Sequence, residues 1–147
     1  MGPELLEDEK SFLGCGMKFP PAVDSRTGRF ELSDADDKVK ESISLILNTY
    51  KGERLMLPLF GSELHNYVFA STDSTTRNLM AHSIKKSITW HEKRITDLDV
   101  SVTVDAQKSE CLNININYVV TQSNLQGNMV FPFYIQEGMK ENADEDK

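Results

Sequence analysis

The spacing of hydrophobic positions changes from helical to extended within residues 77–105. In the first half, the residues that fall on one face of a helix are Met80, Ala81, Ile84, Ile88 and His91. In the second half, polar residues alternate with Leu98, Val100, Val102 and Val104. Periods of about 3.6 and 2 residues are typical of a helix and a half-buried strand. The pattern predicts a helix over about 75–92, a strand over 98–105, and a charged corner over 90–95 between them.

A second helix is predicted upstream, over about 33–48. Its apolar face collects Val39, Ile43, Ile46, Leu47 and Tyr50. Ser33 is placed as an N-cap with Asp36 three residues later, and Gly52 is placed as the residue after the C-cap. Residues 53–60 contain a proline and are expected to form an extended, mostly buried connection. Residues 63–69 are expected to form one or two helical turns.

Two further strands are predicted in the C-terminal part of the chain. The clearer one alternates asparagines with Leu112, Ile114, Ile116, Tyr118 and Val120. It follows the 98–105 strand after a short loop, which favours an antiparallel hairpin. Residues 129–135 form the other candidate, and Pro132 places it at a sheet edge because proline lacks the N–H that a central strand needs. Phe131 and Phe133 share one face of this strand and are expected to lie in the core.

These elements predict an α+β fold, with a small antiparallel sheet of about three strands and two main helices packed on one face. A single domain is expected over residues 11–136. The N-terminal tail, 1–10, and the C-terminal tail, 137–147, are acidic and poor in core-forming residues. We expect the first tail to be flexible and the second to be disordered.

The net charge of −7 is concentrated in these tails. Residues 1–10 hold four acids and one lysine, and residues 137–147 hold five acids and two lysines, so the folded part is close to neutral. Lysines and arginines are not concentrated enough anywhere in the chain to bind along a phosphate backbone, so direct binding of nucleic acid is not expected. The N-terminus lacks the apolar core of a signal peptide, and no apolar run is long enough to span a membrane, so synthesis in the cytoplasm without membrane insertion is expected.

The sequence offers little candidate chemistry. Cys15 and Cys111 lack metal-ligand spacing and are expected to be free thiols, and no phosphate loop or nucleophile motif occurs. Glu92 is the carboxylate best placed for a role, because it ends the central helix. Its neighbours Lys93 and Arg94 should lower its pKa, whereas a general acid needs a raised pKa. The sequence therefore predicts no catalytic residue, no cofactor and no metal site, and favours a binding role for the corner.

Five motifs, in this order, resemble the phage baseplate wedge and sheath-initiator family, also called GPW-like. They are FLGCGMKFPP at 12–21, ILNTYKGERLMLPLFG at 46–61, LHNYVF at 64–69, WHEKRI at 90–95 and NMVFPFYI at 128–135. The hallmark of the family is a Glu-Pro-Arg triplet at the corner after the long helix. Here the triplet is Glu92, Lys93 and Arg94, so both charges are kept and the proline is replaced.

The resemblance implies a structural subunit of a contractile injection machine, of the kinds found in phage tails, extracellular injection particles and type VI secretion baseplates. The implied partners are wedge scaffold proteins, sheath subunits and, as further candidates, inner tube or hub proteins. Six copies per baseplate are expected, assembled in the bacterial cytoplasm and carried in the particle, including outside the cell after release. Some members of the family are labelled lysozyme-like, so the alternative is a cell-wall glycoside hydrolase.

The resemblance also implies which residues bind these partners. The corner would contact the wedge scaffold through Trp90, Glu92, Lys93 and Arg94. Sheath arms would pair with a free edge of the sheet, either the 98–105 strand or the last strand, whose candidate contact residues are Met129, Val130, Phe131, Pro132 and Phe133. An edge strand presents unpaired N–H and C=O groups, which suits strand addition by a partner.

Overall fold

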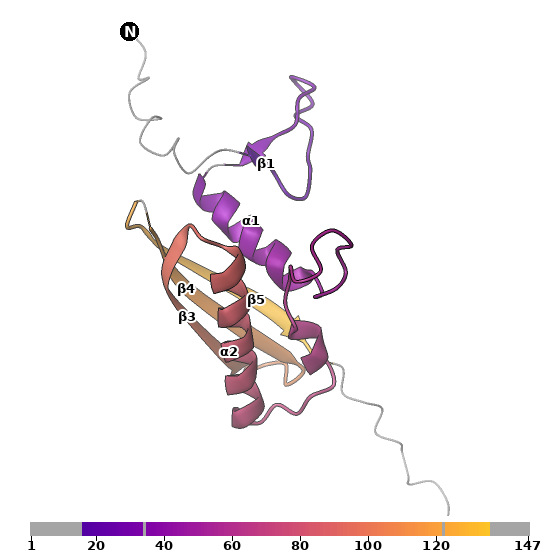
Figure 1. The fold of residues 1–147 in the computed structure, drawn as a ribbon, viewed down its shortest axis with the longest axis vertical. Coiled ribbons are helices and arrows are strands. Elements are labelled where there is room, and N and C mark those ends of the chain that lie inside the picture. Colours follow the sequence, from indigo (N-terminus) through magenta and orange to yellow (C-terminus); the bar gives the residue numbers. More distant parts are fainter. Residues whose placement is uncertain (1–15, 34, 122, 136–147) are drawn as a thin grey trace, which may run out of the picture.

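The computed structural model describes residues 16–33, 35–121 and 123–135. In this part of the chain, two long helices lie against a three-stranded sheet, and a smaller two-stranded sheet lies at the start of the first helix (Figure 1). The predicted α+β architecture is confirmed. The predictions for Cys15 and for the tails at 1–10 and 137–147 lie outside the described residues.

The larger sheet is an antiparallel meander with strand order β3-β4-β5. Its strands are β3 (Ile95–Val104), β4 (Cys111–Val120) and β5 (Gln126–Tyr134). The five apolar residues predicted to alternate along β4 are all buried, and the asparagines between them lie on the opposite face. The last strand begins at Gln126, earlier than predicted, because only a tight turn is needed to reverse the chain after Val120.

Both long helices pack on one face of this sheet (Figure 1). They are α1 (Ala35–Asn48) and α2 (Ser74–His91), with the 3-10 helix η2 (Leu64–Tyr67) between them. The predicted apolar stripes meet in one core, which includes Val39, Ile43, Leu47, Met80, Ile84, Ile88, Leu112, Ile114 and Ile116. Burial of each such side chain contributes about 1.5–3 kcal/mol, so these stripes hold the helices on the sheet.

β3 begins earlier than predicted, and a bulge lies near its start, while the predicted alternation from Leu98 to Val104 is kept. The register with β4 changes between Thr96 and Asp99, and Asp97 has a positive φ of 47°. The extra residue lets both Ile95 and Leu98 face the core, although they are three positions apart. The bulge therefore gives the first residue after the charged corner a place in the core.

The small sheet changes the prediction for the start of the first helix. Its strands are β1 (Gly16–Met17) and β2 (Leu32–Ser33). Ser33 was expected to cap the helix, but it ends β2 and pairs with Gly16, and its hydroxyl donates a hydrogen bond to the Glu41 carboxylate at 3.1 Å. The helix-cap prediction for Ser33 is wrong because the helix begins later, at Ala35.

The connection over 53–60 is neither extended nor buried, which contradicts the prediction. The chain folds back between Tyr50 and Ser62, which form a parallel bridge, and the Gly52 N–H donates to the Pro58 carbonyl at 2.7 Å. This compact loop is too short to reach the core, so Leu55 and Met56 are 95% and 96% exposed. Tyr50 and Gly52 belong to this loop and not to the helix end, because α1 ends at Asn48.

Gly61 closes this loop in a backbone conformation that leaves no room for a side chain. Its φ is +114°, and a Cβ atom there would overlap the carbonyl oxygen of Thr49. Gly52 has a similar positive φ of +89°, but a Cβ atom there would meet nothing within 4 Å. Both alanine variants carry the strain of a positive φ, about 1–2 kcal/mol, and only Gly61→Ala adds a backbone clash.

We therefore expect Gly61→Ala to lower the free energy of unfolding by at least about 2 kcal/mol more than Gly52→Ala does. Urea unfolding followed by circular dichroism measures both values. Equal losses in the two variants would mean that the contact between Gly61 and Thr49 does not hold the loop.

Candidate functional site

The charged corner begins where α2 ends. The Glu92 N–H closes the last turn by donating to the Ile88 carbonyl at 2.8 Å, and the backbone of Glu92 is extended. Lys93, which replaces the proline of the family triplet, donates from Nζ to the Thr89 carbonyl at 3.2 Å. The positive charge of a lysine at this position is also attracted to the negative end of the helix dipole. The helix therefore ends at this point without a proline.

Glu92 and Arg94 form a two-pronged ion pair across the corner. Arg94 donates from Nε to Glu92 Oε1 at 2.8 Å and from Nη2 to Oε2 at 2.7 Å. The Arg94 backbone N–H also donates to Oε1, at 3.1 Å. The Glu92 side chain is only 5% exposed, so this is a buried carboxylate with a guanidinium fitted to both of its oxygens.

Burial by itself would raise the pKa of Glu92, but hydrogen bonds from Arg94 and from Ser42 in α1 outweigh it and hold the pKa below its ordinary value. Arg94 in turn bonds through its carbonyl to the Thr121 N–H at 2.8 Å, just beyond β4. The corner thus ties together α2, α1 and the end of β4. Because Glu92 is held ionised, it is unsuited to the role of a general acid.

The structure separates the residues predicted at the corner into two groups. Trp90 is 67% exposed and Lys93 is exposed, whereas Glu92 is buried and Arg94 is partly buried. We expected the charges of both Glu92 and Arg94 to be available to a partner. They are bonded to each other, so the side chains that face solvent here are chiefly Trp90 and Lys93, whose ammonium group lies 5.6 Å from the Trp90 ring centre.

The residues predicted along the last strand also divide by face. Phe133 is buried, and Met129 and Phe131 are partly buried against the core, which agrees with the prediction for the two phenylalanines. Val130 and Pro132 are exposed on the other face. Among the described strands none pairs with the outer edge of β5, so Pro132 does lie in an edge strand.

The backbone bonds at the ends of β5 show which groups face that outer edge. The Val120 N–H donates to the Leu125 carbonyl and the Ile135 N–H to the Glu110 carbonyl, so odd-numbered residues of this strand face β4. Inward and outward residues alternate in an antiparallel ladder. The backbone groups that face outward are therefore those of Gln126, Asn128, Val130, Pro132 and Tyr134. Four of them present an N–H, and Pro132 leaves a gap in the row.

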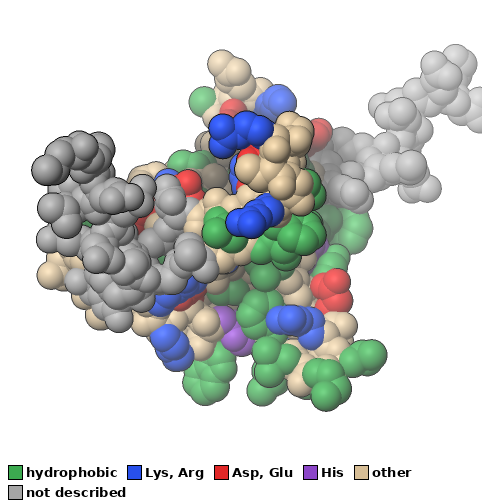
Figure 2. Space-filling model, turned by 90° about the horizontal axis from the view of Figure 1, so that it is seen from above, with side chains coloured by type: hydrophobic (Ala, Val, Ile, Leu, Met, Phe, Trp, Pro, Cys, Tyr) green, Lys and Arg blue, Asp and Glu red, His purple; other side chains and the backbone are tan. Residues whose placement is uncertain are grey.

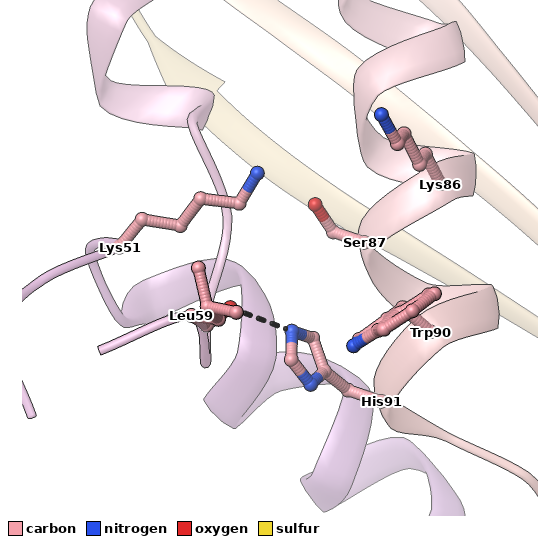
Figure 3. A pocket seen from close by; sticks show the side chains of 6 residues that line it. All are labelled: Lys51, Leu59, Lys86, Ser87, Trp90 and His91. Atoms are coloured by element: carbon pink, nitrogen blue, oxygen red, sulfur yellow. Dashed lines mark hydrogen bonds between the residues drawn. The ribbon is translucent and has the colours of Figure 1, made fainter. Parts of the chain in front are cut away.

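A hollow that the sequence did not predict lies beside Trp90. It has a volume of about 300 Å³ and is lined by α2 and the 50–60 loop, through Lys51, Leu59, Lys86, Ser87, Trp90 and His91 (Figure 3). His91 Nε2 lies 3.0 Å from the Leu59 carbonyl oxygen. His91 was predicted on the apolar stripe of the helix, but no periodicity within one element could show that the loop folds back onto it.

The described residues contain no cluster of three or more histidine, cysteine or acidic side chains suited to a metal. Cys111 is buried and free, as predicted. In the same part of the chain, no helix has both the length and the apolar character needed to cross a membrane.

Comparison with known proteins identifies the family. Residues 33–125 match the family described as baseplate wedge protein gp25, a match that covers α1, α2, the corner and most of the sheet. The chain belongs to the baseplate wedge protein gp25 family. Its role is therefore that of a structural baseplate component, and the resemblance drawn from its motifs is confirmed. No curated protein matches this gp25-family chain.

Solved structures agree with the membership in the gp25 family. A Geobacter sulfurreducens protein, provisionally named a tail lysozyme, is 37% identical, with a TM-score of 0.68 over 74% of this chain and 98% of that one. A chain of the anti-feeding prophage baseplate is 23% identical, with a TM-score of 0.62 over 87% and 90% of the two chains. A chain of a type VI secretion baseplate complex is 18% identical, with a TM-score of 0.56 over 67% and 92%. The last two show a shared fold.

The buried pair in this gp25-family chain predicts how the corner responds to substitution. Arg94→Ala leaves the Glu92 carboxylate buried without its partner, and we expect the free energy of unfolding to fall by about 2–4 kcal/mol. Lys93→Ala is the matched control, because it removes an exposed charge from the same corner and should cost about 0.5 kcal/mol or less. Urea unfolding at neutral pH measures both. Similar losses in both variants would contradict a stabilising role for the pair.

The same pair predicts a dependence on pH. The pKa of Glu92 is depressed in the folded state, so its contribution to stability is present above its ordinary value of 4.5 and is lost as the pH falls through the lowered value. Glu92→Gln removes this contribution, and its stability should change less between neutral and acidic pH than that of the wild type. If the stability of the two proteins changes equally with pH, Glu92 has the same pKa in the folded and unfolded states.

Proposed function

We propose that this baseplate component joins the wedge scaffold at its corner and starts the contractile sheath by pairing the outer edge of β5 with an arm of a sheath subunit. The observation that carries the proposal is the outward row of backbone groups at Gln126, Asn128, Val130, Pro132 and Tyr134. Their side chains lie on the exposed face of the sheet, so an added strand would meet both free backbone groups and accessible side chains.

Strand addition at this edge is supported by the energetics of the ladder. Each new backbone hydrogen bond contributes about 0.5–1.5 kcal/mol net, and the partner needs no deep pocket. The missing donor at Pro132 discourages unselective pairing of edges between free copies. The other edge, along β3, remains the alternative edge for the sheath arm. Its outward backbone groups belong to residues whose side chains face the core, since the Asp105 N–H bonds to Cys111.

The corner supports contact with the scaffold in a different way than its sequence suggests. The Glu92–Arg94 pair shapes the turn between α2 and β3, and the turn presents Lys93 next to Trp90 and leaves part of Arg94 exposed. A rigid corner loses little conformational entropy when it binds. The proposed partners are the wedge scaffold proteins and the sheath, with inner tube or hub proteins as further neighbours.

Copy number and location follow from the same proposal. Six copies would stand in each baseplate ring, an arrangement consistent with the sixfold symmetrised anti-feeding prophage baseplate to which this fold is similar. Assembly would take place in the bacterial cytoplasm, and the subunit would remain in the baseplate of the finished particle, also after release.

A cell-wall glycoside hydrolase is the second candidate, because the 37% identical relative carries the provisional name of a tail lysozyme. Such an enzyme needs two carboxylic groups on either side of a sugar cleft, one of them with a raised pKa. Among the described residues, no acidic side chain lines the hollow beside Trp90, and the pKa of Glu92 is lowered. We expect the purified protein to leave the turbidity of a peptidoglycan suspension unchanged. Clearing that depends on one of its carboxylates would overturn the structural role.

The two proposed contacts should fail at different stages of assembly. Val130→Pro removes an outward N–H from β5 but leaves the ladder to β4 intact, so we expect the variant to fold, to enter baseplates and to carry no sheath. Lys93→Glu reverses an exposed corner charge, and we expect it to be reduced several-fold in purified baseplates. Electron microscopy of particles and immunoblots of baseplate fractions measure both.

Proline at a neighbouring position supplies the matched control. Phe131→Pro removes an N–H that faces β4, so it should destabilise the fold itself, and its circular dichroism melt should separate it from Val130→Pro. Val100→Pro tests the outward side of β3. If Val130→Pro and Val100→Pro both fold and both give sheaths of normal length, strand addition is not how this protein starts a sheath.

A further inference from the structure

The hollow beside Trp90 has walls from two elements that are far apart in the sequence. Figure 3 shows Lys51, from the loop, and Lys86, from α2, on the two sides of the hollow, with the Ser87 side chain between them. Below these polar groups lie Leu59 and the rings of Trp90 and His91. The hollow therefore combines a cationic side with an apolar side.

The loop wall of the hollow is held in place by several contacts. His91 Nε2 lies 3.0 Å from the Leu59 carbonyl oxygen, and the rings of Phe60 and His91 are 4.9 Å apart. The Arg54 guanidinium also lies 4.8 Å from the centre of the Phe60 ring. The hollow is thus formed before any partner arrives, which lowers the entropic cost of binding.

Positive charge gathers around the hollow although the whole chain carries −7. α2 contains no acidic residue from Ser74 to His91. Glu63 is the carboxylate nearby: it pairs with Lys51 at 2.7 Å, and Lys51 first and Lys86 more weakly lower its pKa. A second hollow of about 300 Å³ shares Lys86 and Trp90 and adds His82, Lys85, Thr89 and Lys93. Four lysines therefore line the two hollows, and of these Lys51 pairs with Glu63.

The same side exposes large apolar side chains. Leu59 is 69% exposed and Trp90 67%, and the tip of the loop carries the almost fully exposed Leu55 and Met56. In the view from above, hydrophobic side chains and Lys or Arg side chains lie next to one another along the lower part of the surface, with a histidine between them (Figure 2). Such a mixed patch, apolar with a charged rim, is typical of a protein-binding surface.

We propose that the hollow between α2 and the 50–60 loop binds an acidic segment of a partner protein, one that places a carboxylate between Lys51 and Lys86 and an apolar side chain on Leu59 and Trp90. Lys51 and Lys86 favour the carboxylate, and Leu59 and Trp90 favour the apolar side chain. This surface is separate from the outer edge of β5. It relies on the proposed function only in that the partner would be another baseplate protein.

Trp90 makes the proposal directly measurable, because it is the only tryptophan in the chain. The first probe is a short peptide in which two leucines are flanked by glutamates, titrated into the full-length protein while Trp90 emission is recorded. We expect a saturable change in emission. Binding should weaken about tenfold or more when glutamines replace the glutamates. It should weaken similarly when salt is raised to about 0.5 M, because salt screens the attraction between exposed charges. Unchanged emission, or equal binding of the glutamine peptide, would overturn the proposal.

Charge variants locate the binding. Lys86→Glu should weaken the peptide about tenfold or more, whereas Lys86→Arg should keep most of the affinity. Lys108→Glu is the matched control, because it makes the same change on the exposed loop between β3 and β4 and should bind like the wild type. Both positions are on the surface, so unchanged thermal melts are expected for all three variants. If Lys108→Glu weakens the peptide as much as Lys86→Glu does, the attraction is only the overall charge.

The assembled particle supplies the second readout. A photo-crosslinking amino acid at Leu59 should link, within purified baseplates, to a segment of another protein that holds acidic residues beside an apolar one. A crosslink to a second copy of this chain, or to a sheath subunit, would overturn the assignment of the partner. The peptide titration uses the isolated protein, so it tests the hollow even if the proposed roles in scaffold docking and sheath initiation prove wrong.

Discussion

The architecture depends on a buried ion pair at the point where helix turns into sheet. Charged groups lose several kcal/mol when they leave water, and the loss is recovered only if geometry and hydrogen bonding are nearly complete. Glu92 meets this condition through both prongs of Arg94, a backbone N–H and Ser42. Glu92 and Arg94 together link α2, α1 and the end of β4, so the direction in which β3 leaves α2 is fixed before any partner binds.

The ion pair limits what the corner can offer to a partner. The charges of Glu92 and Arg94 satisfy one another, and only part of the Arg94 side chain is left accessible. The side chains that the turn leaves on the surface are Trp90 and Lys93, and these are the corner residues that the proposed contact with a scaffold would use.

Periodicity predicted the parts of the fold that one element determines alone. The alternation from Leu112 to Val120 and the stripe from Met80 to Ile88 gave the right strand and helix, because each has one buried face. The loop around Leu55 and Met56 was misread, since hydrophobic content indicated burial but the hydrogen bonds of a compact loop decide where its tip points. The hollow lay beyond sequence reasoning for a related reason: Lys51 and Lys86 meet only through tertiary packing. The partner roles assigned to the corner and to residues 129–133 stay predictions.

The gap at Pro132 has a consequence for alignment. A uniform edge would accept an added strand in several registers, each shifted by two residues and nearly equal in energy. At this edge donors are present at Gln126, Asn128, Val130 and Tyr134 and absent at Pro132, so every register that spans Pro132 leaves one carbonyl of the added strand without a donor. A strand that ends before Pro132 avoids this loss and pairs only along Gln126 to Val130. The gap therefore narrows the set of favourable registers for any strand added at this edge.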